Sequence, residues 1–68
     1  MTLKQFRKLQ IGDEITNIRG PGVILKVTNR RWREDGGLLE LELNGKTWTN
    51  DLRCAEYQQA YKQTGLPL

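Results

Sequence analysis

Residues 38–50, LLELELNGKTWTN, contain the pattern that decides the fold. Leucine alternates with glutamate up to Asn44-Gly45, and Asn-Gly is the preferred pair at the centre of a two-residue type I′ turn. That preference arises because both central residues of the turn need a positive φ. The alternation and the turn together predict an antiparallel β-hairpin with one apolar face and one polar face.

A two-residue turn also predicts how the two strands of this hairpin pair. Leu43 would lie opposite Lys46, and Leu41 would lie opposite Trp48. The buried face would then consist of Leu39, Leu41, Leu43 and Trp48. The polar face would consist of Glu40, Glu42, Thr47 and Thr49. We interpret the two glutamates as solvated, because no apolar pocket is apparent that would turn one of them into a general acid.

Two further strands are predicted before the hairpin, at residues 14–18 and 23–28. The apolar residues of the first, Ile15 and Ile18, are one position off alternation, which indicates a bulge or an early strand end. Residues 20–22, Gly-Pro-Gly, are predicted to form the turn between the two strands. A phosphate-binding loop is the alternative, but such loops lead into a helix, whereas this one leads into a strand.

Helices are predicted at both ends of the chain. Thr2 and Gln5 fit a capping box for a helix at residues 2–9, in which apolar residues recur at near-helical spacing. Strong helix formers at about residues 51–63 follow an N-cap at Asn50 or Asp51. The apolar stripe of this second helix would be Cys54, Tyr57 and Tyr61.

These elements predict a single domain, residues 1–68, of the all-β class with flanking helices. The strands would form a small, strongly bent antiparallel barrel over about residues 12–50, because the chain is too short for a sandwich of two full sheets. A domain of this size buries only about 60% of the surface that its unfolded chain exposes, so its core is small.

The composition excludes several classes of function. The chain has no histidine, no serine and one cysteine, Cys54, so Ser-His and Cys-His catalysis and a four-ligand zinc site are excluded. A single cysteine cannot form an internal disulfide, which favours a cytoplasmic location. The longest apolar run has three residues, 23–25, and residues 1–10 lack the apolar core of a signal peptide. We therefore expect a cytoplasmic protein that is not an enzyme, needs no cofactor and contacts no membrane.

Residues 29–37, NRRWREDGG, are predicted to form a polar loop and contain the clearest candidate binding site. Arg30, Arg31 and Arg33 flank Trp32, a combination in which guanidinium groups contact phosphates and an indole stacks on a base. The net charge of +3 permits such contact. Supporting contacts would come from Arg19, Lys26 and Lys46. The alternatives are contact with a nucleic-acid-associated protein, or a solvated loop whose indole folds back over the core.

The rival hypothesis is a protein–protein interaction module, an adaptor or inhibitor of the kind that mobile elements encode. It would use Trp32 together with a patch formed by Tyr57 and Tyr61, since large amphipathic side chains dominate interface energetics. If the C-terminal helix docks on the barrel, however, the tyrosines are core or rim residues. A lone helical cysteine such as Cys54 is typically a small core residue.

Residues 11–27, IGDEITNIRGPGVILKV, resemble the opening of the SH3-like barrels of the KOW and Tudor kind. Gly12-Asp13 matches the start of that family's first strand, Ile15 its first core position, and residues 20–24 its turn into the second strand. Similar domains are the CarD-type RNA polymerase-binding domain and the Tudor-like C-terminal domain of UvrD/PcrA-type helicases. The resemblance, over roughly residues 11–52, implies an SH3-like barrel that binds RNA polymerase, ribosomal components or nucleic acid.

Overall fold

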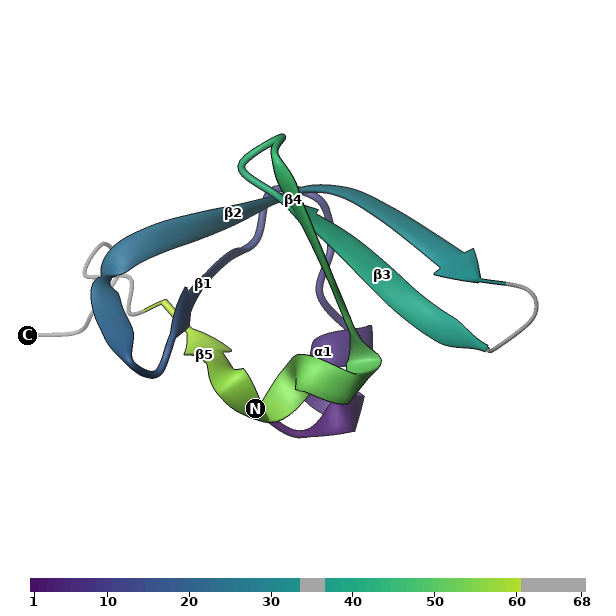
Figure 1. Cartoon of the computed structure of the whole chain (residues 1–68), viewed down its shortest axis with the longest axis horizontal. Helices are drawn as coiled ribbons and strands as arrows, with labels where there is room; N and C mark the ends of the chain where they lie inside the picture. Colours follow the sequence, from purple (N-terminus) through teal and green to yellow (C-terminus); the bar gives the residue numbers. More distant parts are fainter. Residues whose placement is uncertain (34–36, 61–68) are drawn as a thin grey trace, which may run out of the picture.

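The structure is a computed structural model that describes residues 1–33 and 37–60. Its elements, in chain order, are α1 (Leu3–Arg7), β1 (Glu14–Asn17), β2 (Gly20–Arg33), β3 (Leu38–Leu43), β4 (Thr47–Asn50), the 3-10 helix η1 (Asp51–Glu56) and β5 (Tyr57–Gln59). In this part of the chain the strands form one antiparallel sheet of five, in the order β4-β3-β2-β1-β5 (Figure 1).

The long strand β2 joins the two halves of the sheet. Its first half pairs with β1 and its second half pairs with β3, so it crosses the whole molecule in Figure 1. The pairing shifts between Val27 and Asn29, where Thr28 is an extra residue, and a bulge of this kind bends a strand and increases its twist. The sheet is therefore strongly bent, as expected, but it is not a closed barrel, because β4 and β5 remain its two edges.

The core lies between the bent sheet and the two short helices. Figure 1 shows α1 and η1 on the side toward which the sheet bends. The buried apolar side chains are those of Phe6, Leu9, Ile15, Val27, Leu39, Leu41, Leu43 and Tyr57. Phe6 lies in α1 and Leu9 follows it, so the N-terminal segment covers one side of the core. Burial of these two side chains stabilises a helix that would be too short to be stable alone.

The capping box predicted at the N-terminus is present. The Gln5 backbone N–H donates to the Thr2 hydroxyl at 3.1 Å, and the Thr2 N–H donates to the Gln5 side-chain oxygen at 2.9 Å. The helix is shorter than the predicted range of residues 2–9, because it ends at Arg7. Leu9 is nevertheless buried, as its place in the apolar pattern indicates.

The prediction of a polar loop at residues 29–37 is wrong for its first part, because residues 29–33 continue β2. Arg30 lies opposite Leu41 and Trp32 opposite Leu39 in the ladder with β3. Arg30 and Trp32 therefore occupy the positions on the core face of β2, where aliphatic residues would be expected. This is why the sequence lacks the alternation of apolar and polar residues that predicts a strand. The remaining predicted loop residues 34–36 lie outside the described residues.

The turn between the first two strands also lies elsewhere than predicted. Asn17 pairs with Gly20, so the connection consists of Ile18 and Arg19, and residues 20–22 already belong to β2. The side-chain oxygen of Asn17 accepts the Arg19 backbone N–H at 2.8 Å, an Asx turn that replaces the expected glycine turn. The predicted irregularity in this strand is confirmed by the register shift between Ile15 and Asn17.

The hairpin at Asn44-Gly45 is present, but the predicted register is wrong by one residue. Leu41 lies opposite Thr49 and Glu42 opposite Trp48, so the connection is formed by the three residues 44–46. Contacts with β2 explain the longer connection: Asn44 donates its N–H to the Lys26 carbonyl at 2.8 Å, and Gly45 donates to the Thr28 hydroxyl at 2.9 Å. A shift of one residue moves Trp48 from the core face to the polar face.

The C-terminal helix predicted at residues 51–63 is not observed. Residues 51–56 form η1, with Asn50 as its N-cap, and Tyr57 begins β5. Pairing with β1 places Tyr57 opposite Asn17 and buries the tyrosine to 7% exposure. Tertiary pairing therefore overrides the helical propensity of this segment. Residues 61–63 lie outside the described residues.

The hairpin register predicts that Thr49→Val stabilises the fold. Thr49 is 4% exposed, and its hydroxyl has no hydrogen-bond partner in the described part of the chain. Replacing a buried, unpaired hydroxyl by a methyl group of similar shape should raise the free energy of unfolding by about 1 kcal/mol, measured by urea denaturation. The matched control is Thr47→Val, at an exposed position, which should change stability by less than about 0.5 kcal/mol. Equal effects of the two substitutions would contradict the register.

Candidate nucleic-acid interface

The four residues predicted to form one binding site occupy successive positions of β2, from Arg30 to Arg33. Side chains of successive strand residues point to opposite faces of a sheet. One pair, Arg30 and Trp32, lies on the face that α1 covers, and the other pair, Arg31 and Arg33, lies on the opposite face. The structure thus divides the predicted site into two surfaces.

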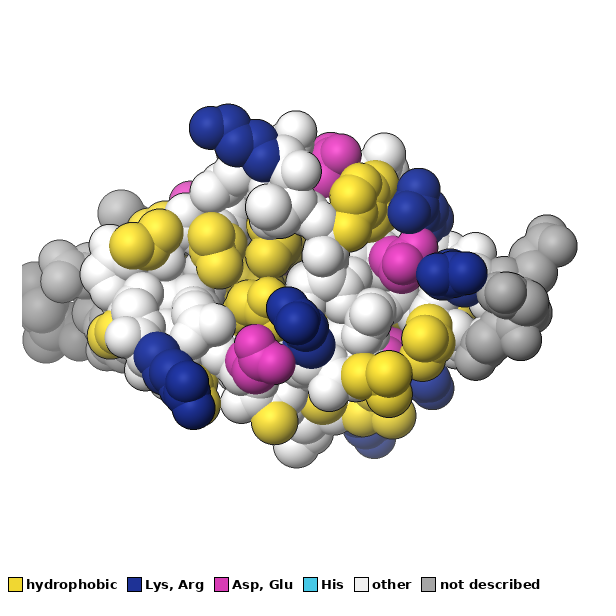
Figure 2. All heavy atoms as spheres, in the orientation of Figure 1, with side chains coloured by type: hydrophobic (Ala, Val, Ile, Leu, Met, Phe, Trp, Pro, Cys, Tyr) yellow, Lys and Arg dark blue, Asp and Glu magenta, His cyan; other side chains and the backbone are white. Residues whose placement is uncertain are grey.

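The first surface, called here the outer surface, consists of Arg31, Arg33, Glu40, Glu42 and Trp48. Arg31 donates to a Glu40 carboxylate oxygen at 2.7 Å, and its guanidinium group lies 4.0 Å from the centroid of the Trp48 ring. Arg33 also lies 3.9 Å from Glu40. Figure 2 shows acidic and basic side chains side by side at the end of the molecule where β2 and β3 lie. The arginines of the outer surface therefore already have carboxylate partners.

The second surface, called here the Trp32 surface, consists of Lys4, Arg7 and Lys8 from the N-terminal segment and Arg30 and Trp32 from β2. The Arg7 guanidinium group lies over the Trp32 ring, 5.5 Å from its centroid. Trp32 is 53% exposed, and both lysines are exposed. The helix itself contains no acidic residue. The exposed indole therefore lies beside the Arg7 guanidinium group, and Lys4 and Lys8 line the same part of the N-terminal segment as Arg7.

Arg30 fixes the position of α1 relative to β2. One terminal nitrogen of its guanidinium group donates to the backbone carbonyl of Arg7 at 3.0 Å. This carbonyl is in the last turn of α1, where carbonyls lack a partner within the helix, so Arg30 acts as a cap for the helix C-terminus. The contact also holds the basic face of α1 next to Trp32, so Arg30 positions this surface as well as adding charge to it.

Asp51 fixes the position of Arg7. Its carboxylate, 4% exposed, accepts hydrogen bonds at 3.1 Å from both the Arg7 side chain and the Leu39 backbone N–H. A buried carboxylate needs such partners, because an isolated charge in the core is strongly unfavourable. The pair joins α1, β3 and η1, and it holds the Arg7 guanidinium group where it can lie over Trp32.

The other predicted contact residues belong to segments other than the Trp32 surface. Arg19 is in the β1–β2 turn, Lys26 lies opposite Glu14 in the sheet, and Lys46 is in the hairpin connection. Of the predicted tyrosine patch, Tyr57 is a core residue and Tyr61 lies outside the described residues. Cys54 has a free thiol and packs partly buried against the core, in agreement with its interpretation as a packing residue.

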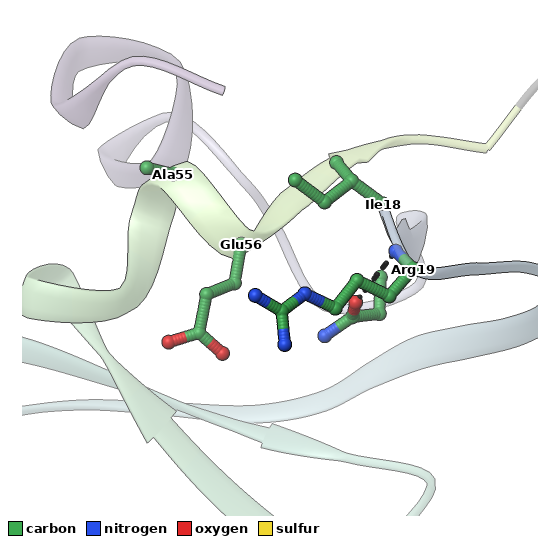
Figure 3. A pocket seen from close by; sticks show the side chains of 5 residues that line it. Ile18, Arg19, Ala55 and Glu56 are labelled. Atoms are coloured by element: carbon green, nitrogen blue, oxygen red, sulfur yellow. Dashed lines mark hydrogen bonds between the residues drawn. The ribbon is translucent and has the colours of Figure 1, made fainter.

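Arg19 lines a crevice that the sequence does not indicate. The crevice lies between the β1–β2 turn and the end of η1 (Figure 3), and its lining consists of Asn17, Ile18, Arg19, Ala55 and Glu56. Its one basic and one acidic side chain, Arg19 and Glu56, have opposite charges, and both are exposed. The crevice therefore lacks the excess of positive charge found at the Trp32 surface.

Lys4, Arg7 and Lys8 are not among the contact residues predicted from the sequence, because the N-terminal helix was predicted only from its apolar residues. The signal was present, because these residues recur at i, i+3 and i+4 and therefore share one helix face. What the sequence could not indicate is that β2 continues to Arg33 and places Trp32 beside that face.

Comparisons with known proteins do not define a family for this chain. No family model, curated protein or solved structure matches it. None of the described helices has the length and apolar character that crossing a membrane requires. Nor do residues 1–33 and 37–60 contain a cluster of three or more histidine, cysteine, aspartate or glutamate side chains that could hold a metal ion. The function must be inferred from the surfaces described above.

The role of Asp51 predicts a clear loss of stability in Asp51→Ala. The substitution leaves the Leu39 N–H without its acceptor in the core and releases Arg7, which should cost about 2–3 kcal/mol in the free energy of unfolding. Urea denaturation followed by far-UV circular dichroism measures this loss. Asp51→Asn retains one acceptor oxygen and serves as the matched variant, with a smaller expected loss. A loss below about 0.5 kcal/mol in Asp51→Ala would show that this carboxylate does not hold α1 in place.

Proposed function

We propose that the protein is a non-catalytic module that binds nucleic acid, alone or within a machine that handles it, through the Trp32 surface. The observation that supports this function is the exposed indole of Trp32 next to the Arg7 guanidinium group, with the exposed Lys4 and Lys8 close to Arg7. Cationic side chains bind the phosphate backbone and an exposed aromatic ring stacks on bases, so this combination suits a nucleic acid. The proposed function needs neither a cofactor nor a catalytic group.

The fold supports the same class of partner through the resemblance of residues 11–27. We propose that the bent sheet is an opened relative of the SH3-like barrels of the KOW and Tudor kind. Support comes from the strand order β4-β3-β2-β1-β5, from a long β2 shared by both halves of the sheet, and from the 3-10 helix between β4 and β5. Domains of that kind bind RNA polymerase, ribosomal components or nucleic acid.

Charge distribution favours the Trp32 surface over the outer surface as the contact site. On the outer surface, a phosphate that approaches Arg31 also meets the Glu40 carboxylate, which repels it. The carboxylate that pairs with Arg7 on the Trp32 surface, that of Asp51, is buried as Glu40 is, so the difference lies in the other charges, and the outer surface also carries Glu42. Lys4 and Lys8 are exposed and belong to a segment without acidic residues. A phosphate therefore encounters a more favourable potential at the Trp32 surface.

The rival function, a protein-interaction module, is supported by a different observation. Ile18, Val23 and Ile24 are exposed apolar side chains of the β1–β2 hairpin, and exposed apolar side chains can contribute to a protein contact. The tyrosine patch on which this hypothesis first depended is not supported, since Tyr57 is buried. The module would then use the hairpin, with Trp32 as a second contact.

Fluorescence anisotropy with labelled oligonucleotides tests the proposed function. The wild-type protein should bind at low salt with a Kd of about 10⁻⁴ to 10⁻⁶ M and weaken as salt rises. Lys4→Ala/Lys8→Ala should weaken binding about tenfold and reduce the log–log salt slope by roughly 0.7 for each lysine removed. These two exposed lysines contribute little to folding, so the effect would be one on binding.

The matched control is Lys26→Ala/Lys46→Ala, which removes the same two charges elsewhere on the molecule. It should change the affinity less than about twofold. An equal loss in both double variants would mean that net charge alone drives binding and would remove the Trp32 surface from the proposal. If the wild-type protein binds no oligonucleotide at low salt, the proposed function is wrong.

A further inference from the structure

We infer that the ligand of the Trp32 surface is a single-stranded segment of nucleic acid, with an unpaired base stacked on the Trp32 ring. This inference rests on the proposed function and adds to it the class of nucleic acid. Three features of the surface support it: the exposure of the ring, the fixed guanidinium group beside it, and the short span of its cations.

The first feature is that the Trp32 ring is available for stacking. Trp32 is 53% exposed although its partner in β3, Leu39, is fully buried. In a duplex, the faces of the bases are covered by neighbouring base pairs. An aromatic side chain can stack only on a base that is unpaired or flipped out, and such stacking contributes to single-strand binding with little dependence on sequence.

The second feature is that Arg7 holds the Trp32 ring from one side. Its guanidinium group is held by Asp51 at 3.1 Å and lies 5.5 Å from the centroid of the Trp32 ring. Much of its charge is therefore balanced, and a base would stack on the face of the indole that Arg7 leaves free. Planar guanidinium groups also stack on bases in single-stranded complexes. Trp32 and Arg7 together form a preorganised platform for a base, because neither group has to be ordered when the ligand binds.

The third feature is that the spacing of two exposed lysines suits the backbone of a single strand. Lys4 and Lys8 are separated by one helical turn, about 6 Å along the axis of a helix that rises about 1.5 Å per residue. This separation suits adjacent phosphates of one strand. Two phosphates of one strand can therefore be bound by Lys4 and Lys8 without a second strand.

Intrinsic fluorescence provides the test, because the chain has two tryptophans. In a Trp48→Phe background, Trp32 is the one remaining reporter, and phenylalanine retains an aromatic partner for Arg31. The probes are oligo(dT), oligo(U) and a blunt-ended DNA duplex of equal length, each titrated at low salt. We expect both single strands to quench Trp32 fluorescence and to bind at least about tenfold more tightly than the duplex.

Trp32→Leu, made in the wild-type chain and followed by anisotropy, tests the stacking itself. Because Trp32 is exposed, the variant should fold, and its thermal unfolding curve checks this. It should weaken single-strand binding about tenfold and leave duplex binding unchanged, and Trp32→Phe should restore part of the affinity.

The outcomes separate the two proposals. Duplex binding as tight as single-strand binding, without quenching of Trp32, would overturn the single-strand inference and leave the proposed function standing. An equal loss of both affinities in Trp32→Leu would overturn the stacking role. Absence of binding to all three probes would overturn both proposals together.

Discussion

Successive side chains of a β-strand point to opposite faces of the sheet. Residues 30–33, the most basic segment of the chain, lie in β2 and are therefore divided between its two faces. Arg30 and Trp32 face α1, whereas Arg31 and Arg33 face Glu40. Two surfaces of different character follow. One consists of arginines paired with carboxylates, and the other combines an exposed indole with cations. The proposed function depends on this division more than on the number of basic residues.

The rest of the fold supports the division. Thr28 is the extra residue at which β2 bends from β1 toward β3, and its hydroxyl contacts both Glu42 and Gly45. Beyond this bend, Arg30 reaches the carbonyl of Arg7 and so joins α1 to the sheet. The Asp51 carboxylate joins the side chain of Arg7 to the Leu39 backbone of β3. The basic face of a helix with five residues, marginal in isolation, is thereby held beside a single tryptophan.

The sequence predicted those elements whose signal is local and failed where distant contacts decide. The capping box of Thr2 and the hairpin at Asn44-Gly45 were predictable because each depends on a few adjacent residues. The hairpin register was not, because contacts of Asn44 and Gly45 with β2 select a three-residue connection. The helix expected after Asn50 gave way to pairing between β5 and β1. At the candidate site, Trp32 was predicted from the sequence. Its neighbour Arg7 on α1 was not, because that contact depends on the continuation of β2 to Arg33.

The most direct test of this account is a nuclear magnetic resonance titration of the ¹⁵N-labelled protein with a short single-stranded oligonucleotide. The two tryptophans provide one indole N–H signal for each surface, since Trp32 lies beside Arg7 and Trp48 beside Arg31. We expect the indole signal of Trp32 and the backbone amide signals of α1 to shift on binding, while the indole signal of Trp48 stays in place. A shift of the Trp48 signal without a shift of the Trp32 signal would place binding on the outer surface and contradict the account.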